Sequence, residues 1–106
     1  MGNLSIATKI PSHSEAYVFG SVLNSLAPDD FDLLIVYDPE VCPPQNAYVC
    51  HSPLCEDISI MFRLPVHLTA LTRSEAMHVR FIEKTNALPL EMALEQLSRN
   101  LPLSFA

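Results

Sequence analysis

The stretch that most constrains the fold of this chain covers residues 16–38 and reads AYVFGSVLNSLAPDDFDLLIVYD. Residues 31–37 are almost entirely apolar, which is typical of a strand buried on both faces at the centre of a sheet. Residues 16–19 are aromatic and β-branched and predict a shorter strand. Between the two strands we expect a Gly-Ser turn and a short helix over residues 22–26, which ends before Pro28.

The middle of the chain predicts a helix followed by a third strand. Asn46 is suited to cap a helix that runs to about Leu64, and Pro53 should kink or break that helix. The strand is expected over residues 66–71, where apolar and polar residues alternate.

Two further helices are expected after the third strand. Thr72 and Glu75 have the spacing of a capping box at the start of the first helix, which should fade near Asn86. The second helix covers about residues 90–100 and carries one stripe of leucines: Leu90, Leu94, Leu97 and Leu101. Such a stripe usually belongs to the core, and an exposed part of it would mark a partner or dimer face.

The order β-α-β-α-β-α-α predicts an α+β domain with α/β-type layers, in which helices pack on a small mixed sheet. The chain has 106 residues, of which 49% are hydrophobic and 17% charged, a composition typical of one globular domain. We therefore expect a single domain over residues 1–106. Its motif-bearing part covers about residues 15–83, and the helix over residues 90–100 follows it.

Charge and hydropathy exclude several classes of protein. The net charge is −6 with only six Lys and Arg residues, so we expect no bulk electrostatic binding of nucleic acid. No apolar run approaches the roughly 20 residues that span a bilayer. The first residues also lack the apolar segment of a secretory signal, so we expect a cytoplasmic protein without a membrane partner.

The three cysteines, an odd number, indicate reduced thiols rather than a disulfide framework. Cys42, Cys50, His51 and Cys55 are zinc-ligand types, but their spacing lacks the paired Cys-x-x-Cys of a zinc knuckle. Buried thiols on a helix are the preferred interpretation. No Ser-His-Asp hydrolase arrangement can be argued from the order of residues alone.

Gly20 and Ser21 form a candidate phosphate site. Gly20 is the only glycine inside the expected fold, and it directly follows a predicted strand. A helix that begins there would present unpaired N–H groups to an anion, and a glycine lets a phosphate approach the backbone. Ser21 adds a hydroxyl donor. The alternative is an ordinary turn between two secondary-structure elements.

Asp30 and Asp32 form a candidate metal site. Residues i and i+2 of a strand point to the same face, so both carboxylates would lie together while Phe31 points into the core. Two such carboxylates at the start of a buried strand favour a cation between them, and Mg²⁺ prefers oxygen ligands. The alternative is that Asp29 and Asp30 are loop acids and Asp32 caps a turn.

These motifs occur in a recognisable order: Phe19-Gly20-Ser21, a spacer, Asp30-Phe31-Asp32 and Leu33. The set resembles the signature of the nucleotidyltransferase superfamily of DNA polymerase beta. The small size is most similar to the minimal nucleotidyltransferases, including those paired with HEPN-type toxins.

The resemblance implies a function for each motif. Gly20 and Ser21 would hold the β and γ phosphates of a nucleoside triphosphate, with ATP as the expected one, and Asp30 and Asp32 would bind Mg²⁺. A hydroxyl of a protein or small molecule would then attack the α-phosphate, and pyrophosphate would leave.

The chain departs from this family at the third carboxylate, because His67 stands where an Asp or Glu is usual. Neutral imidazole is a poor Mg²⁺ ligand but accepts a proton near neutral pH. The alternative is a solvated polar residue at a strand edge. Positive charge to bind a triphosphate could come from only a few side chains: Arg63, Arg73, Arg80 and Lys84.

Two functions remain open at this point. The first is a magnesium-dependent nucleotidyltransferase that transfers a nucleotide to a hydroxyl. The second is a catalytically degenerate member of the fold that acts through a protein partner, of the toxin–antitoxin type or as a homo-oligomer.

Overall fold

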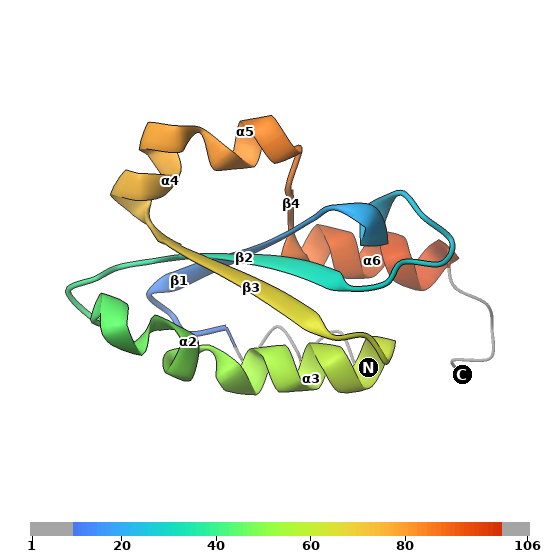
Figure 1. The fold of residues 1–106 in the computed structure, drawn as a ribbon, viewed down its shortest axis with the longest axis horizontal. Coiled ribbons are helices and arrows are strands. Elements are labelled where there is room, and N and C mark those ends of the chain that lie inside the picture. Colours follow the sequence, from blue (N-terminus) through green and yellow to red (C-terminus); the bar gives the residue numbers. More distant parts are fainter. Residues whose placement is uncertain (1–9, 101–106) are drawn as a thin grey trace.

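The computed structural model describes residues 10–100, with side chains for residues 10–97. These residues form a four-stranded mixed sheet with helices on both faces (Figure 1). The α+β class predicted from the sequence is therefore confirmed. No helix in this part of the chain has the length and apolarity to cross a membrane.

The strands are β1 (Ser14–Phe19), β2 (Phe31–Tyr37), β3 (Val66–Thr72) and β4 (Leu88–Pro89), in the spatial order β3-β2-β1-β4. β2 pairs antiparallel with β1 and parallel with β3. All residues of β2 except Asp32 are buried, so the apolar run forms the central strand as predicted.

The two faces of β2 enter two different cores. One face contributes Phe31, Leu33, Ile35 and Tyr37 to the larger core, together with α3 (Ser52–Phe62) and α6 (Leu90–Asn100). The other face contributes Leu34 and Val36, which pack with residues of α4 (Arg73–Val79) and α5 (Phe81–Thr85). Asp32 shares the parity of Leu34 and Val36 and therefore lies on the face that α4 and α5 cover.

The prediction of a helix over residues 22–26 is wrong. The chain forms only a short 3₁₀ helix, η1 (Ser21–Leu23), and Leu26 is fully exposed. A longer helix would have nothing to bury at Leu26. In addition, the Ser25 hydroxyl accepts a hydrogen bond from the Ala27 N–H, which gives the backbone a local alternative to the helix.

The helix expected from Asn46 to Leu64 is broken, as Pro53 predicted. It comprises η2 (Pro44–Asn46), α2 (Ala47–Cys50) and α3, and Pro53 occupies the first turn of α3. There its missing N–H would have no intrahelical partner anyway. Asn46 precedes α2, but its side chain makes no capping hydrogen bond, so that detail of the prediction is wrong.

The helix after β3 begins at the predicted capping box. Thr72 Oγ1 accepts from the Glu75 N–H at 3.1 Å, and Glu75 Oε1 accepts from the Thr72 N–H at 2.8 Å. The helix does not continue, however, because Arg80 adopts a left-handed conformation with φ of 54° and separates α4 from α5. The bend places Phe81 edge-on against Phe19, with ring centroids 5.1 Å apart.

The C-terminal part contains one expected and one unexpected element. The sequence did not predict β4, a two-residue strand that pairs antiparallel with β1. α6 has the predicted bounds, and Leu90, Leu94 and Leu97 of its leucine stripe are buried in the larger core. Leu101 lies outside the described residues.

Candidate metal centre

Strand register brings the two aspartates and the histidine together. Asp32 of β2 lies directly beside His67 of the parallel strand β3, so the two side chains share a face. Asp30 precedes β2 by one residue. The Phe31 N–H donates to the Pro65 carbonyl at 2.9 Å, which ties the beginnings of both strands together. The sequence had not singled out Pro65 for this role.

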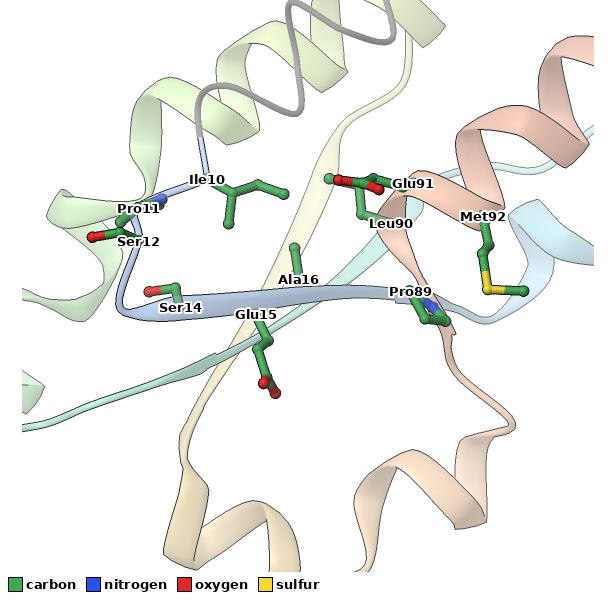
Figure 2. Close-up of a pocket in the computed structure, with 10 residues that line it drawn as sticks. All are labelled: Ile10, Pro11, Ser12, Ser14, Glu15, Ala16, Pro89, Leu90, Glu91 and Met92. Carbon is green, nitrogen blue, oxygen red and sulfur yellow. The ribbon is translucent and has the colours of Figure 1, made fainter.

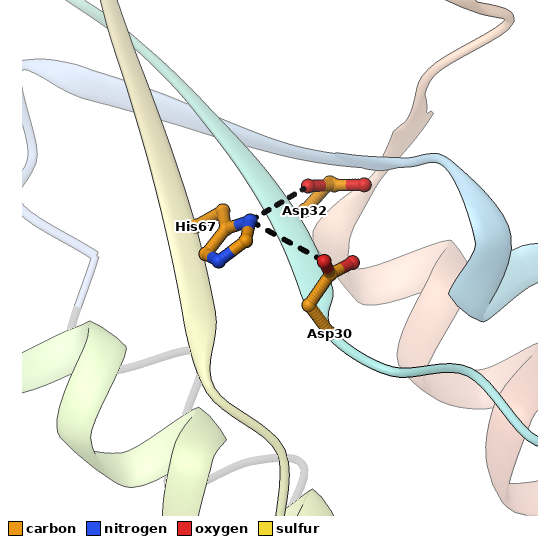
Figure 3. Close-up of side chains that lie close together, drawn as sticks. All are labelled: Asp30, Asp32 and His67. Carbon is orange, nitrogen blue, oxygen red and sulfur yellow. Dashed lines mark ion pairs between the residues drawn. The ribbon is translucent and has the colours of Figure 1, made fainter.

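The three side chains point toward one another at the start of β2 and β3 (Figure 3). His67 Nδ1 lies 3.4 Å from Asp30 Oδ2 and 3.8 Å from Asp32 Oδ1. One potential ligand atom from each residue falls within 4.8 Å of the others. The aspartate side chains are 28% and 24% exposed and that of His67 is 64% exposed, so the centre is open to solvent.

Gly20 lies against this centre, because Phe19 pairs with Asp32 across β1 and β2. Its φ of +85° favours glycine, and a Cβ placed there would collide with Asp32 Oδ2 and lie 3.1 Å from Asp32 Cγ. The absence of a side chain at Gly20 therefore makes room for the Asp32 carboxylate. The phosphate-binding role expected of Gly20 stays a prediction.

Ser21 begins η1 and is exposed. Its carbonyl accepts hydrogen bonds from the Asn24 and Ser25 N–H groups. Because η1 is a single turn, it aligns fewer N–H groups toward an anion than the predicted helix would. The structure thus places Gly20 and Ser21 next to the aspartates but on a shorter element than expected.

The electrostatics of the centre favour a cation. Partial burial raises the pKa of the Asp32 carboxyl, and the neighbouring Asp30 charge raises it further, while His67 acts in the opposite direction. The charged form of Asp32 is therefore less favourable than that of a free aspartate, and a cation bound beside it would offset this cost.

The donor set fits a divalent cation. Two carboxylates and one imidazole converge from one edge of the sheet, and the open side leaves room for further oxygen ligands. Mg²⁺ prefers an all-oxygen octahedron, whereas imidazole is a better ligand for Mn²⁺ or Zn²⁺. The residues thus fit the class of cofactor that the sequence indicated, with His67 favouring a metal that accepts nitrogen.

The basic residues considered for triphosphate binding are dispersed. Arg73 directly follows β3, at the end of that strand that lies away from the centre, and its Nη1 pairs with Glu15 at 3.2 Å. Arg80 Nε pairs with Glu83 at 3.3 Å. Lys84 is exposed on α5, which contacts Phe19 through Phe81.

Arg63 ends α3 shortly before β3, where it adopts a left-handed conformation and is exposed. α3 packs on the face of β2 opposite to Asp32, whereas α5 covers the face that carries Asp32. Residues of α5 are therefore better placed by the fold to approach the centre than Arg63 or Arg73.

A separate hollow of about 530 Å³ lies beside β1 and the beginning of α6 (Figure 2). It is lined by Ser14, Glu15, Leu90, Glu91 and neighbouring residues, and shares none with the metal centre. Two acids and no Lys or Arg are among its lining residues. This lining is unsuited to a triphosphate.

The cysteines do not form a zinc site with His51. Both nitrogens of His51 are hydrogen-bonded: Nδ1 lies 2.7 Å from the Ala47 carbonyl, and Nε2 lies 2.8 Å from the Ser14 hydroxyl. The group that Nδ1 contacts is a backbone carbonyl rather than a carboxylate. The buried His51 therefore links β1 to α2 through these two hydrogen bonds.

The expectation of buried thiols on a helix holds only in part. Cys42 is buried but lies in the loop before η2, Cys50 of α2 is exposed, and Cys55 of α3 is half-buried.

No protein-family model matches this chain, and no curated protein or solved structure is significantly similar to it. The likeness to nucleotidyltransferases consequently rests on the motif residues, and their function has to be inferred from the geometry of the centre.

Proposed function

We propose that this chain is a nucleotidyltransferase that depends on a divalent cation and transfers a nucleotide from a nucleoside triphosphate to a hydroxyl acceptor. The observation that carries the proposal is the convergence of Asp30, Asp32 and His67 within 4.8 Å, beside Gly20. Paired carboxylates that hold a cation next to a side-chain-free turn provide the two elements that phosphoryl-type transfer needs, namely charge neutralisation and positioning.

Each residue has a distinct task in this proposal. Asp30 and Asp32 hold the cation, which neutralises charge on the phosphates when it is bound. Gly20 leaves space at the turn for the Asp32 carboxylate, and Gly20 and Ser21 would hold the β and γ phosphates of the triphosphate. His67 directs Nδ1 toward the two carboxylates, so it acts as the third ligand, and its exposed side chain leaves the ring accessible to an incoming hydroxyl.

The test is nucleotide transfer from α-labelled triphosphates to candidate protein and small-molecule hydroxyls, in the presence of Mg²⁺ or Mn²⁺. We expect labelling by the wild type and none by an Asp30→Asn, Asp32→Asn double variant. Asp29→Asn is the matched control, because Asp29 is the exposed neighbouring acid outside the cluster. Equal labelling by the wild type and the double variant would refute the proposal.

A second function is favoured by the pairing of basic side chains. Arg73 and Arg80 are engaged with Glu15 and Glu83, which leaves less positive charge for a triphosphate. A catalytically degenerate module that acts through a protein partner, such as a HEPN-type toxin or a second copy of this chain, would not need that charge.

Copurification separates the two functions. If a partner is retained equally by the wild type and the Asp30→Asn, Asp32→Asn variant, and neither transfers nucleotide, the binding module is the correct function.

A further inference from the structure

Cys42 and Cys50 form a thiol pair at the opposite end of β2 from the metal centre. Cys42 lies in the loop after β2, and Cys50 is the last residue of α2 (Figure 1). Cys42 Sγ donates to Cys50 Sγ at 2.8 Å. A disulfide bond is about 2.05 Å long, so bond formation requires a movement of less than about 1 Å. The third cysteine, Cys55, has no such sulfur partner among the described contacts.

The two thiols of this pair differ in accessibility. Cys50 is exposed, whereas Cys42 is only 1% exposed. Burial raises the pKa of the Cys42 thiol to about 11, and the hydrogen bond to Cys50 contributes in the same direction. The thiolate is the reacting form of cysteine, so a reagent in solution meets Cys50 first and Cys42 reacts only afterwards.

We propose that Cys42 and Cys50 are a reversible dithiol–disulfide site, in which Cys50 receives a low-molecular-weight disulfide and Cys42 resolves it. The site is independent of the proposed nucleotide transfer, because neither cysteine contributes to the Asp30–Asp32–His67 cluster.

The exchange proceeds in two balanced steps. The Cys50 thiolate attacks one sulfur of the small disulfide, forms a mixed disulfide and releases one small thiolate. Cys42 Sγ then attacks Cys50 Sγ, which breaks the mixed bond and releases the second small thiol, to which the Cys42 proton is transferred. Two protein thiols are oxidised, and one small disulfide is reduced to two thiols.

The bond would restrain a segment that positions the buried His51. Residues 42–50 contain η2 and α2, and the Ala47 carbonyl within them contacts His51 Nδ1. A cross-link across this segment limits its local unfolding, because the unfolded ensemble loses chain entropy. Oxidation should therefore slow amide exchange in α2 and raise the thermal midpoint of the whole chain.

The test is oxidation of the reduced full chain with oxidised glutathione, followed by blocking of free thiols and peptide mass mapping. We expect a loss of about 2 Da from the wild type, a cross-linked Cys42–Cys50 peptide and full recovery with a reducing agent. Cys55 should remain free, and a Cys55→Ala control should behave like the wild type.

The single variants identify the order of events. Cys42→Ala should stop at a stable glutathione adduct on Cys50, and Cys50→Ala should form neither the adduct at this site nor the cross-link. A wild type that keeps the adduct on Cys50, or that links either cysteine to Cys55 or to a second chain, would overturn the proposal. These contradicting outcomes are all observed in the wild type, so the test does not depend on the folding of a variant.

Discussion

At the scale of single residues, Gly20 is a position where the backbone conformation and the candidate metal centre constrain each other. Its φ of +85° is unfavourable for residues with a side chain, and a Cβ would displace the Asp32 carboxylate. We expect Gly20→Ala to lower the free energy of unfolding by roughly 1–3 kcal/mol and to abolish cation-dependent stabilisation.

Urea denaturation with and without Mn²⁺ measures both effects. Ser21→Ala is the matched control, since Ser21 is exposed and lies one residue further along. If Gly20→Ala retained the full response to the cation, the steric argument for Gly20 would be wrong.

Ionisation of Asp32 works against folding in the chain without a bound cation. Its folded-state pKa lies above the ordinary value of 3.8, mainly because of partial burial and then because of Asp30. The folded chain consequently binds this proton more tightly than the unfolded chain. The free energy of unfolding should therefore fall as the pH rises from about 3.8 through the folded-state pKa.

We expect Asp32→Asn to be more stable than the wild type at pH 7 in a chelator, with a difference that disappears when the pH falls below about 3.8. Thermal unfolding across this pH range provides the measurement, and Asp29→Asn is the exposed control. If the wild type were more stable than Asp32→Asn at neutral pH without metal, the predicted cost of ionising Asp32 would be contradicted.

At the scale of elements, the capping box at the start of α4 is a local signal that the structure reproduces. Both of its hydrogen bonds are present, between Thr72 and Glu75. Thr72→Ala should lower the free energy of unfolding by about 1 kcal/mol, because the Glu75 N–H loses its acceptor. Chemical denaturation of Thr72→Ala, Glu75→Ala and the double variant tests this.

The two single effects should add to more than the effect of the double variant, since the residues share one motif. Fully additive effects would show that the two hydrogen bonds act separately.

Elements with strong local patterns were predictable from the sequence, and those set by tertiary contacts were not. β2 and α6 follow from hydrophobic runs and stripes, and the break before α3 follows from Pro53. The bend at Arg80 could not be predicted, because it depends on the contact between Phe81 and Phe19. β4 is too short to carry a pattern and exists through its pairing with β1.

The same distinction applies to the candidate site. Asp30 and Asp32 share a face by the alternation of any strand, so the sequence was sufficient to pair them. The position of His67 beside Asp32 requires the parallel register of β2 and β3. The resemblance suggested that position, but local pattern alone could not, since residues on different strands meet only through sheet pairing.

At the scale of the whole molecule, the candidate metal centre joins the beginnings of two neighbouring strands, so a cation bound there should influence global stability. A cation that binds only the folded chain stabilises it by about 2.7 kcal/mol at a concentration one hundredfold above Kd. We expect the thermal midpoint to rise with Mn²⁺ and to respond to Mg²⁺ only at higher concentration, because His67 supplies a nitrogen ligand.

Variants of the centre make this prediction specific. The Asp30→Asn, Asp32→Asn chain should show no shift with either ion, and His67→Asp should respond to Mg²⁺ at lower concentration than the wild type, because it completes an all-oxygen set. Thermal unfolding scans of the three chains over a range of ion concentrations measure the concentration at which each ion shifts the thermal midpoint of each chain. If His67→Asp left the relative response to Mn²⁺ and Mg²⁺ unchanged, His67 would not be a ligand, and the cation would be held by the two aspartates alone.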